Sequence, residues 1–366
     1  MGDVYEKLAF HLSTLAMGFP YREQLLEFLR EHLTEIEAQV LLALPTKVAP
    51  LQPVGVDEIA GKVNLPTEEL VDILESLSGR GLLFSGKTNE GKRGYALQQV
   101  GFGFPQAFFW GGEDTPYARH MTDLLFRYFR RQELIEAYGG AETKPNRYIP
   151  VGKTIDHETQ AVFPYHGMES VIQQARVFAV AHCPCRVTRH IQGKSCNHPV
   201  EVCLKFDEMA EYLIERGFGR EITREEAREI IIKSEEAGLV HFVDNAIKGV
   251  KHNCNCCGCA CWNVGAIRRR QIPRDVLMAT YFIRETDEDE CVGCGNCVEI
   301  CPVDAITIEG DYPAIDQDWC IGCGVCVRQC SNGAARLKLR TDRPDHSPLP
   351  DFLTLHKEIL KGKQPG

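Results

Sequence analysis

The stretch Cys291-Val-Gly-Cys294-Gly-Asn-Cys297-Val-Glu-Ile-Cys301-Pro302 is followed by a second copy, Cys320-Ile-Gly-Cys323-Gly-Val-Cys326-Val-Arg-Gln-Cys330-Ser331. Each cysteine of the first copy has a counterpart 29 positions later. The same offset relates Ala305 to Ala334, so the duplication continues beyond the cysteines. A C-x2-C-x2-C run can present three thiolates to one centre from a tight loop, and the glycines between them let the backbone approach closely. The repeat therefore predicts two related centres.

Cysteine usage is the outlier in an otherwise ordinary composition. The chain has 366 residues, of which 44% are hydrophobic and 25% charged, and 17 are cysteines. The first cysteine is Cys183, and the odd total argues against a framework of disulfides. Closely spaced thiolates are soft ligands that select zinc or iron–sulfur centres.

The duplicated segment resembles a bacterial two-cluster ferredoxin. The resemblance implies that Cys291, Cys294, Cys297 and Cys330 hold one [4Fe–4S] cluster, and that Cys320, Cys323, Cys326 and Cys301 hold the other. One departure is Ser331, which stands where the family has its second proline. Because that proline ligates nothing, both clusters are still expected. Zinc ribbons are the alternative, which two C-x2-C-x2-C-x3-C runs disfavour.

Nine further cysteines lie upstream, in two groups. They are Cys183, Cys185, Cys196, Cys203, Cys254, Cys256, Cys257, Cys259 and Cys261. Their density predicts one or two further [4Fe–4S] clusters. A single cluster with bystander thiols, or zinc and free thiols, are the alternatives, because no complete C-x2-C-x2-C run occurs here.

Histidines are also frequent in this region: His157, His166, His182, His190, His198 and His252. Each one taken singly is expected to be an ordinary packed or solvated side chain. His182 and His252 lie closest in sequence to the cysteine motifs and are the best candidates for a role at a centre. Arg186 is expected to offset negative charge near a cluster.

The fold class expected is α+β, in several domains. Residues 1–100 are expected to form a helical domain that resembles a winged helix, and residues 101–284 an α+β cysteine-rich iron–sulfur domain. Residues 285–340 are the ferredoxin-like two-cluster domain, and 341–366 a C-terminal arm. As a whole, the chain resembles multicluster iron–sulfur proteins of anaerobic bacteria.

Several local elements are predicted from periodicity and punctuation. Helices are expected over 35–44, 67–77, 117–138, 169–180 and 207–216, and from the capping box Thr223–Glu226 to Ala237. Strands are expected over 82–84, 95–97, 147–151, 239–243 and 306–308, and near 336–338. The elements between 207 and 243 are expected to return the Cys254–Cys261 segment to the side of Cys183–Cys203.

Charge bears on partners and compartment. The formal net charge is −10, and the helix expected over 67–77 carries Glu68, Glu69, Asp72 and Glu75, so a nucleic-acid partner is not expected. The acidic run 285–290 could steer a basic partner or be a solvated linker. No apolar run is long enough to span a membrane, and the N-terminus lacks a signal-peptide pattern. A cytoplasmic protein is therefore expected.

These features favour an electron-transfer protein. It would relay electrons through several [4Fe–4S] clusters between redox partner proteins, such as a flavoprotein or a larger oxidoreductase complex, in anaerobic metabolism. This makes it an electron-transfer subunit of an oxidoreductase complex rather than a stand-alone enzyme. One alternative is a reductase subunit with a catalytic cluster in the Cys183–Cys261 region, and another is a redox-sensing transcription regulator that uses the winged helix.

Overall fold

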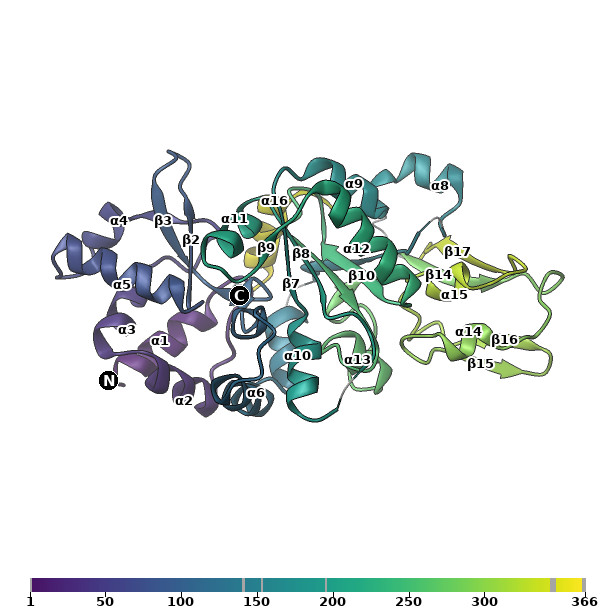
Figure 1. The fold of residues 1–366 in the computed structure, drawn as a ribbon, viewed down its shortest axis with the longest axis horizontal. Coiled ribbons are helices and arrows are strands. Elements are labelled where there is room, and N and C mark those ends of the chain that lie inside the picture. Colours follow the sequence, from purple (N-terminus) through teal and green to yellow (C-terminus); the bar gives the residue numbers. More distant parts are fainter. Residues whose placement is uncertain (1, 140–141, 153, 195, 343–346, 364–366) are drawn as a thin grey trace.

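The computed structural model describes residues 2–139, 142–152, 154–194, 196–342 and 347–363. Helical elements at the N-terminal end, a large central sheet and the duplicated cysteine segment follow one another along the longest axis of the molecule (Figure 1). The chain mixes helices and strands throughout, which is compatible with the expected α+β class. Within the described residues, no helix combines the length and apolarity needed to cross a bilayer.

The N-terminal hundred residues form short helices beside a small antiparallel sheet. The helices are α1 (Val4–Ser13), α2 (Glu23–His32), α3 (Glu35–Leu42), α4 (Val56–Ala60) and α5 (Thr67–Gly79). The sheet has the order β1-β3-β2, from β1 (Val54–Gly55), β2 (Leu83–Lys87) and β3 (Arg93–Leu97). A capping box between Thr34 and Glu37 opens α3, because each side chain satisfies a free backbone N–H of the other.

The connecting region is less regular than the sequence predicts. The helix predicted over 117–138 is interrupted: α6 spans Pro116–Tyr128, α7 spans Arg131–Leu134, and a π-turn covers Ile135–Gly139. The Tyr128 hydroxyl donates to the Pro20 carbonyl oxygen, and Phe129 packs against Phe104 with ring centroids 6.3 Å apart. These contacts with distant residues turn the chain where the local periodicity would have continued it.

A seven-stranded sheet forms the centre, in the order β13-β6-β10-β12-β8-β7-β9. Its strands are β6 (Asn146–Ile149), β7 (Phe178–His182), β8 (Glu201–Phe206), β9 (Arg220–Glu221), β10 (Val240–Asp244), β12 (His252–Cys256) and β13 (Met278–Ala279). All pairs are antiparallel except β13 with β6. One face is covered by α9 (Met168–Gln174) and α12 (Arg224–Glu236), through a core that includes Ile172, Leu204, Ile231 and Val243.

The prediction of a helix over 169–180 is wrong for the second half of that range. The helix ends as α9 at Gln174, and Phe178–His182 is instead β7, which is paired on both sides by β8 and β9. Val177 to Ala181 is an apolar run that suits either a buried helix or a buried strand, and the partner strands decide between them. The strand delivers the chain to Cys183, where α10 (Pro184–Ile191) begins.

The duplicated segment and the tail complete the chain. The duplicated segment contains β14 (Phe282–Thr286), α14 (Asn296–Glu299), β15 (Ile306–Glu309), β16 (Tyr312–Ile315), α15 (Val325–Arg328) and β17 (Ala335–Leu339). β14 pairs with β17 and β15 with β16, so the two ends of the repeat are tied together. The tail forms β18 (Leu349–Asp351), parallel to β11 (Ala246–Lys248), and then α16 (Phe352–Gly362), whose apolar face is buried.

Candidate metal centres

One group of cysteines in the duplicated segment is open to solvent. Cys291, Cys294, Cys297 and Cys330 line the same small cavity, and Cys294 is exposed. Gly293 adopts φ 65°, and a Cβ there would lie 2.8 Å from the Asp311 carbonyl oxygen. Only glycine fits this loop, which wraps the thiols tightly.

The backbone around Cys330 suits a thiolate. Partial burial acts to raise its pKa, but the N–H groups of Ala335, Asn332, Ala334 and Gly333 hydrogen-bond the sulfur and leave the pKa below its usual value. Backbone N–H groups aimed at a ligand sulfur stabilise its negative charge.

The second group in the segment is buried. Cys301, Cys320, Cys323 and Cys326 are each 8–9% exposed, and burial raises the pKa of Cys323 and Cys326, with neighbouring cysteines adding to the effect. Gly322 adopts φ 61°, and a Cβ there would lie 2.0 Å from the Phe282 carbonyl oxygen. In both groups, three thiols come from one copy of the repeat and the fourth from the other copy. This is the arrangement the ferredoxin resemblance implies, and the donor sets suit [4Fe–4S] clusters.

The buried group lies against the central sheet. The Val151 N–H, just after β6, donates to the Cys323 carbonyl oxygen at 2.9 Å. A Cβ on Gly258, within the Cys254–Cys261 segment, would lie 1.8 Å from the Pro302 carbonyl oxygen beside Cys301. Arg268 also pairs with Asp304 at 2.8 Å. The duplicated segment is therefore packed firmly on the middle region.

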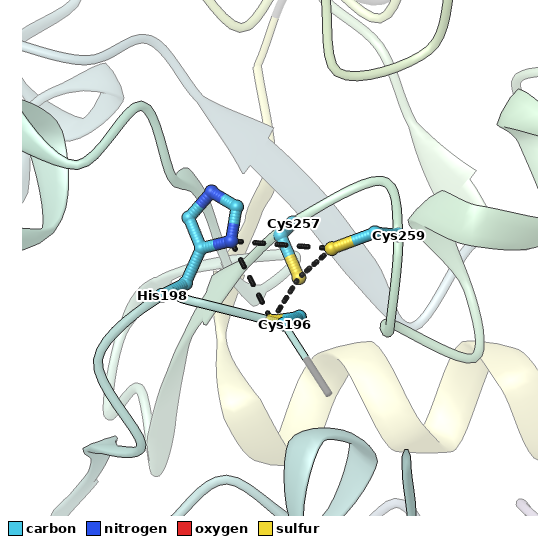
Figure 2. A group of neighbouring side chains, drawn as sticks. All are labelled: Cys196, His198, Cys257 and Cys259. Atoms are coloured by element: carbon cyan, nitrogen blue, oxygen red, sulfur yellow. Dashed lines mark hydrogen bonds between the residues drawn. The ribbon is translucent and has the colours of Figure 1, made fainter. Parts of the chain in front are cut away.

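The nine upstream cysteines separate into two sets. Cys196, Cys257 and Cys259 meet His198, and their ligand atoms all lie within 4.8 Å of one another (Figure 2). Cys196 and His198 come from the loop between α10 and β8, and the other two from the loop after β12. The sequence had placed His198 among ordinary histidines, and only its position two residues after Cys196 could have singled it out.

The other six cysteines line a cavity of about 50 Å³, larger than the roughly 10–15 Å³ that one water needs. They are Cys183, Cys185, Cys203, Cys254, Cys256 and Cys261. Strand alternation places several of them: Cys254 and Cys256 on β12, and Cys203 on the adjacent β8, share the face opposite α9 and α12. Six soft donors around one cavity suit an iron–sulfur cluster.

These six thiols form a continuous series. Cys183 interacts with Cys185, Cys185 with Cys261, Cys261 with Cys256, Cys256 with Cys254, and Cys254 with Cys203. The backbone N–H of Trp262 also donates to the Cys185 sulfur at 3.5 Å. The predicted return of the Cys254–Cys261 segment to Cys183–Cys203 is confirmed by these contacts.

Two buried cations adjoin the thiols. Burial acts to lower the pKa of Arg186, but the sulfurs of Cys183, Cys257 and Cys256 raise it above its ordinary value. Arg186 thus faces both sets of upstream cysteines. Lys205 lines the cavity and places its ammonium 5.4 Å from the centre of the Trp110 ring. Buried positive charge of this kind stabilises thiolate-bound centres.

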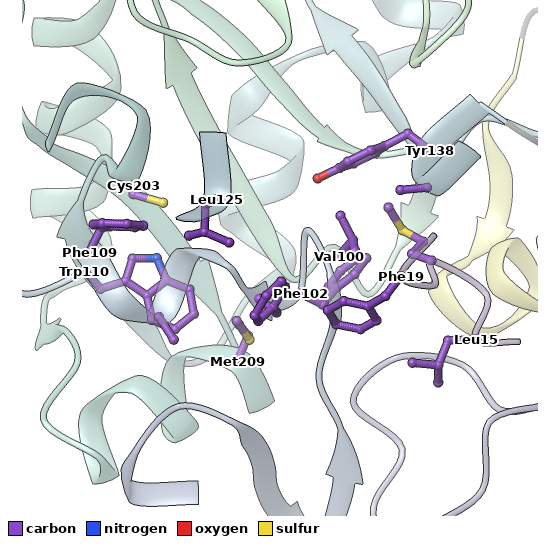
Figure 3. Close-up of a cluster of buried hydrophobic side chains, with 14 of the residues drawn as sticks. Leu15, Phe19, Val100, Phe102, Phe109, Trp110, Leu125, Tyr138, Cys203 and Met209 are labelled. Carbon is purple, nitrogen blue, oxygen red and sulfur yellow. The ribbon is translucent and has the colours of Figure 1, made fainter. Parts of the chain in front are cut away.

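Phe102 and Tyr138 of the connecting region line the cavity. Phe102, Trp110 and Tyr138 pack in the same core cluster as Cys203 (Figure 3). Of the two histidines preferred from sequence, His252 lines the cavity and pairs with Asp244 at 3.0 Å. His182 lies apart, with its Nδ1 3.1 Å from the Trp110 carbonyl oxygen.

A second cavity, of about 440 Å³, begins at Trp262, which lines both cavities. Five cations line it: Arg130, Arg131, Arg189, Lys194 and Arg269. Burial lowers the pKa of Arg269, and the charge of Arg189 lowers it further. Leu125, Phe126 and Phe129 provide an apolar wall, and no acidic residue lines the cavity among the described residues. Sequence reasoning missed this feature, because the cations come from three distant segments.

Comparisons with known proteins bear on the duplicated segment. Residues 285–307 and 313–336 match the 4Fe-4S binding domain family. No curated protein and no solved structure matches the chain. The duplicated segment is therefore a ferredoxin-like iron–sulfur domain that supports at least one [4Fe–4S] cluster.

Proposed function

We propose that this protein relays electrons between a redox partner, docked where Cys291 and Cys294 reach the surface, and a centre held in the six-cysteine cavity. The observation that carries the proposal is the placement of three thiol groups, from one that includes the exposed Cys294 to one that lines a cavity in the central domain. The first is open to solvent, the second is buried beneath it, and the third lies inside the central domain.

The contacts between groups support this order. Tyr148 on β6 is fully buried, and its pKa is raised well above the usual value by burial and then by Cys261, Cys256 and Cys323. A single side chain thus adjoins both the cavity and the buried ferredoxin group. Iron–sulfur clusters in these places would supply one-electron steps, while the protein orients them and excludes water.

Iron counting combined with selective ligand loss tests the proposal. Two clusters in the duplicated segment and one in the cavity predict about 12 iron atoms per chain after anaerobic purification, at four per cluster. Cys261→Ala should lower the count by about four and remove one EPR signal. Cys323→Ala should instead slow reduction of the cavity centre by a protein donor, as followed by freeze-quench EPR.

Each measurement can contradict the proposal. About 8 iron atoms in the unmodified chain would remove the cavity centre. A cavity centre reduced equally fast in the Cys323→Ala variant would show that electrons do not pass through the duplicated segment. Ser170→Ala provides a control variant, because α9 covers the face of the sheet opposite the six-cysteine cavity.

A second candidate function is reduction of a small molecule at the cavity centre. The cation-lined cavity favours this function. Among the residues that the structure describes, Trp262 alone lines both cavities, and the walls of the cation-lined cavity combine positive charge with apolar surface. Such walls suit an anionic molecule with an apolar body. The substrate would be reduced by electrons supplied through the duplicated segment.

The anionic dye 8-anilinonaphthalene-1-sulfonate is a direct probe of that cavity. Binding should enhance its fluorescence and shift the EPR spectrum of the cavity centre. Arg269→Gln should weaken binding at least tenfold, while Arg176→Gln, at an exposed arginine elsewhere, should leave it unchanged. Binding that is insensitive to Arg269, or an unperturbed EPR spectrum, would argue for the relay alone.

A further inference from the structure

Four side chains outside the six-cysteine cavity have the spacing of ligands to a single ion. The Cys196 sulfur lies 3.5 Å from His198 Nδ1 and 3.8 Å from the Cys257 sulfur. The Cys259 sulfur lies 3.3 Å from the Cys257 sulfur and 3.9 Å from His198 Nδ1. Figure 2 shows all four side chains directed toward one common point.

These separations fit one tetrahedral metal. Two sulfurs that each lie about 2.3 Å from one ion, at the tetrahedral angle, are about 3.8 Å apart, and a sulfur and an imidazole nitrogen are about 3.6 Å apart. In a [4Fe–4S] cluster each thiolate binds its own iron, which holds the sulfurs further apart than ligands of a single ion.

The donor set identifies the metal. Three thiolates and one imidazole form a closed set of four protein ligands, which is typical of structural zinc. We propose that Cys196, His198, Cys257 and Cys259 bind one zinc ion, separate from the iron–sulfur centres. Three thiolates on Zn²⁺ leave a net charge of −1, and Arg186, which interacts with Cys257, offsets it from the interior.

The position of the site gives zinc a structural role. Each of two loops supplies two ligands, one loop following α10 and the other following β12. Cys256, directly before Cys257, and Val202, four residues after His198, both line the six-cysteine cavity. A metal bridge between the loops would therefore fix the wall of the cavity and restrict its opening.

The test is metal analysis and X-ray absorption on the full-length holoprotein, purified without oxygen from cells supplied with both iron and zinc. The proposal predicts about one zinc per chain, with three sulfurs at about 2.3 Å and one nitrogen at about 2.0–2.1 Å at the zinc edge. A sample without zinc, or with zinc bound by oxygen ligands, would overturn it.

Two variants test whether the zinc is bound by these side chains. His198→Ala and Cys259→Ser should each remove the zinc, while His157→Ala, at an exposed histidine on α8 (His157–Val162), should retain it. Iron content and the EPR signals of the duplicated segment report whether each variant has folded. Zinc retained in both site variants, or a loss of about four iron atoms in Cys259→Ser, would assign Cys259 elsewhere and contradict the proposal.

Discussion

At the scale of single residues, Arg186 is a buried cation in contact with the upstream thiols. It is fully buried, donates to the carbonyl oxygens of Pro199 and Asn255 at 2.6 and 2.7 Å, and interacts with thiols of both upstream sets. The bonds to two carbonyls fix the guanidinium in place, so its charge acts on the thiol groups at a constant position.

Arg186→Gln should lower the midpoint potential of the cavity centre, because removing a nearby positive charge favours the oxidised state. We expect a shift on the order of 60 mV, a factor of about ten for one electron, measured by EPR-monitored titration. Arg228→Gln is the matched control, since that arginine pairs with Glu169 on the far side of the sheet. An unchanged potential in Arg186→Gln would show that the charge is screened.

The burial of a second residue, His356, makes the stability of the fold depend on pH. The ring on α16 is fully buried, neither ring nitrogen has a hydrogen-bond partner among the described residues, and burial lowers its pKa from 6.5 to about 3. Between these values the unfolded chain binds a proton that the folded chain excludes. The contribution of His356 to the free energy of unfolding is therefore fully present above the pKa that it has in the unfolded chain. This contribution falls as the pH drops from 6.5 toward 3.

The magnitude is at most about 1.4 kcal/mol of unfolding free energy per pH unit within that window. His356→Phe, which suits the aromatic neighbours Phe102 and Phe352, should flatten the dependence. Urea unfolding at pH 7.0 and 5.5 measures the difference. Equal slopes for the variant and the unmodified chain would mean that other groups govern the acid limb.

At the scale of elements, the two short helices α14 and α15 each follow a glycine in left-handed conformation, Gly295 and Gly324. Each helix is followed by the fourth cysteine of its copy, Cys301 or Cys330. Cys301 interacts with Cys320, whereas Cys330 lines the cavity of the first copy's thiols. We therefore expect the fourth ligands to cross over.

If the fourth cysteine of each copy binds the cluster of the other copy, two equivalent substitutions should affect different clusters. Cys301→Ala should destabilise the buried cluster, and Cys330→Ala the exposed one, although each residue belongs to the other copy. Iron release to a chelator, followed with EPR, separates the two, because we expect the unmodified chain to lose the cluster of the more exposed thiols first. If Cys330→Ala removed only the slowly released iron, the crossed assignment would be wrong.

The N-terminal elements are held to the central domain. Glu75 on α5 accepts bonds from Arg93 on β3 and from Arg216 after α11 (Glu208–Glu215), and the Tyr212 hydroxyl donates to the Leu83 carbonyl oxygen. These bonds join the small sheet to the middle region. The outward side chains of α5 include Glu68, Glu69 and Asp72.

At the scale of the whole molecule, the acidic run and the first thiol group share one end. Glu285 and Asp287 are paired with Lys338 and Arg336, while Glu288, Asp289 and Glu290 are exposed directly before Cys291. The α5 helix lies at the opposite end (Figure 1). Negative charge beside the exposed thiols would attract a basic redox partner.

Neutralising Glu288, Asp289 and Glu290 to the matching amides should slow electron transfer to a basic cytochrome by about tenfold at low salt, because electrostatic steering is lost. The rates should converge at high salt, where charges are screened. Stopped-flow kinetics measure both, and the triple amide variant at Glu68, Glu69 and Asp72 is the control. Equal rates at low salt would locate the partner elsewhere.

The local elements were predictable where one local signal was sufficient. Thr223 accepts a bond from the Glu226 N–H and opens α12 as expected, and the strands near Leu83, Tyr95, Ile306 and Leu337 all form. Predictions failed where contacts with residues distant in sequence decide the local backbone conformation. The chain turns after Tyr128, and β7 begins where a helix was expected, because partners distant in sequence stabilise those conformations.

The sequence by itself determined the chemistry of the duplicated segment, because thiol spacing and glycine positions are local properties of a tight loop around a centre. Only the tertiary structure divided the nine upstream cysteines into six around a cavity and three beside His198, because strand pairing brings residues 183–203 and 254–261 together. It also placed five cations from three segments around one cavity. Which donors meet is a property of strand order and side-chain direction, which spacing along the chain does not encode.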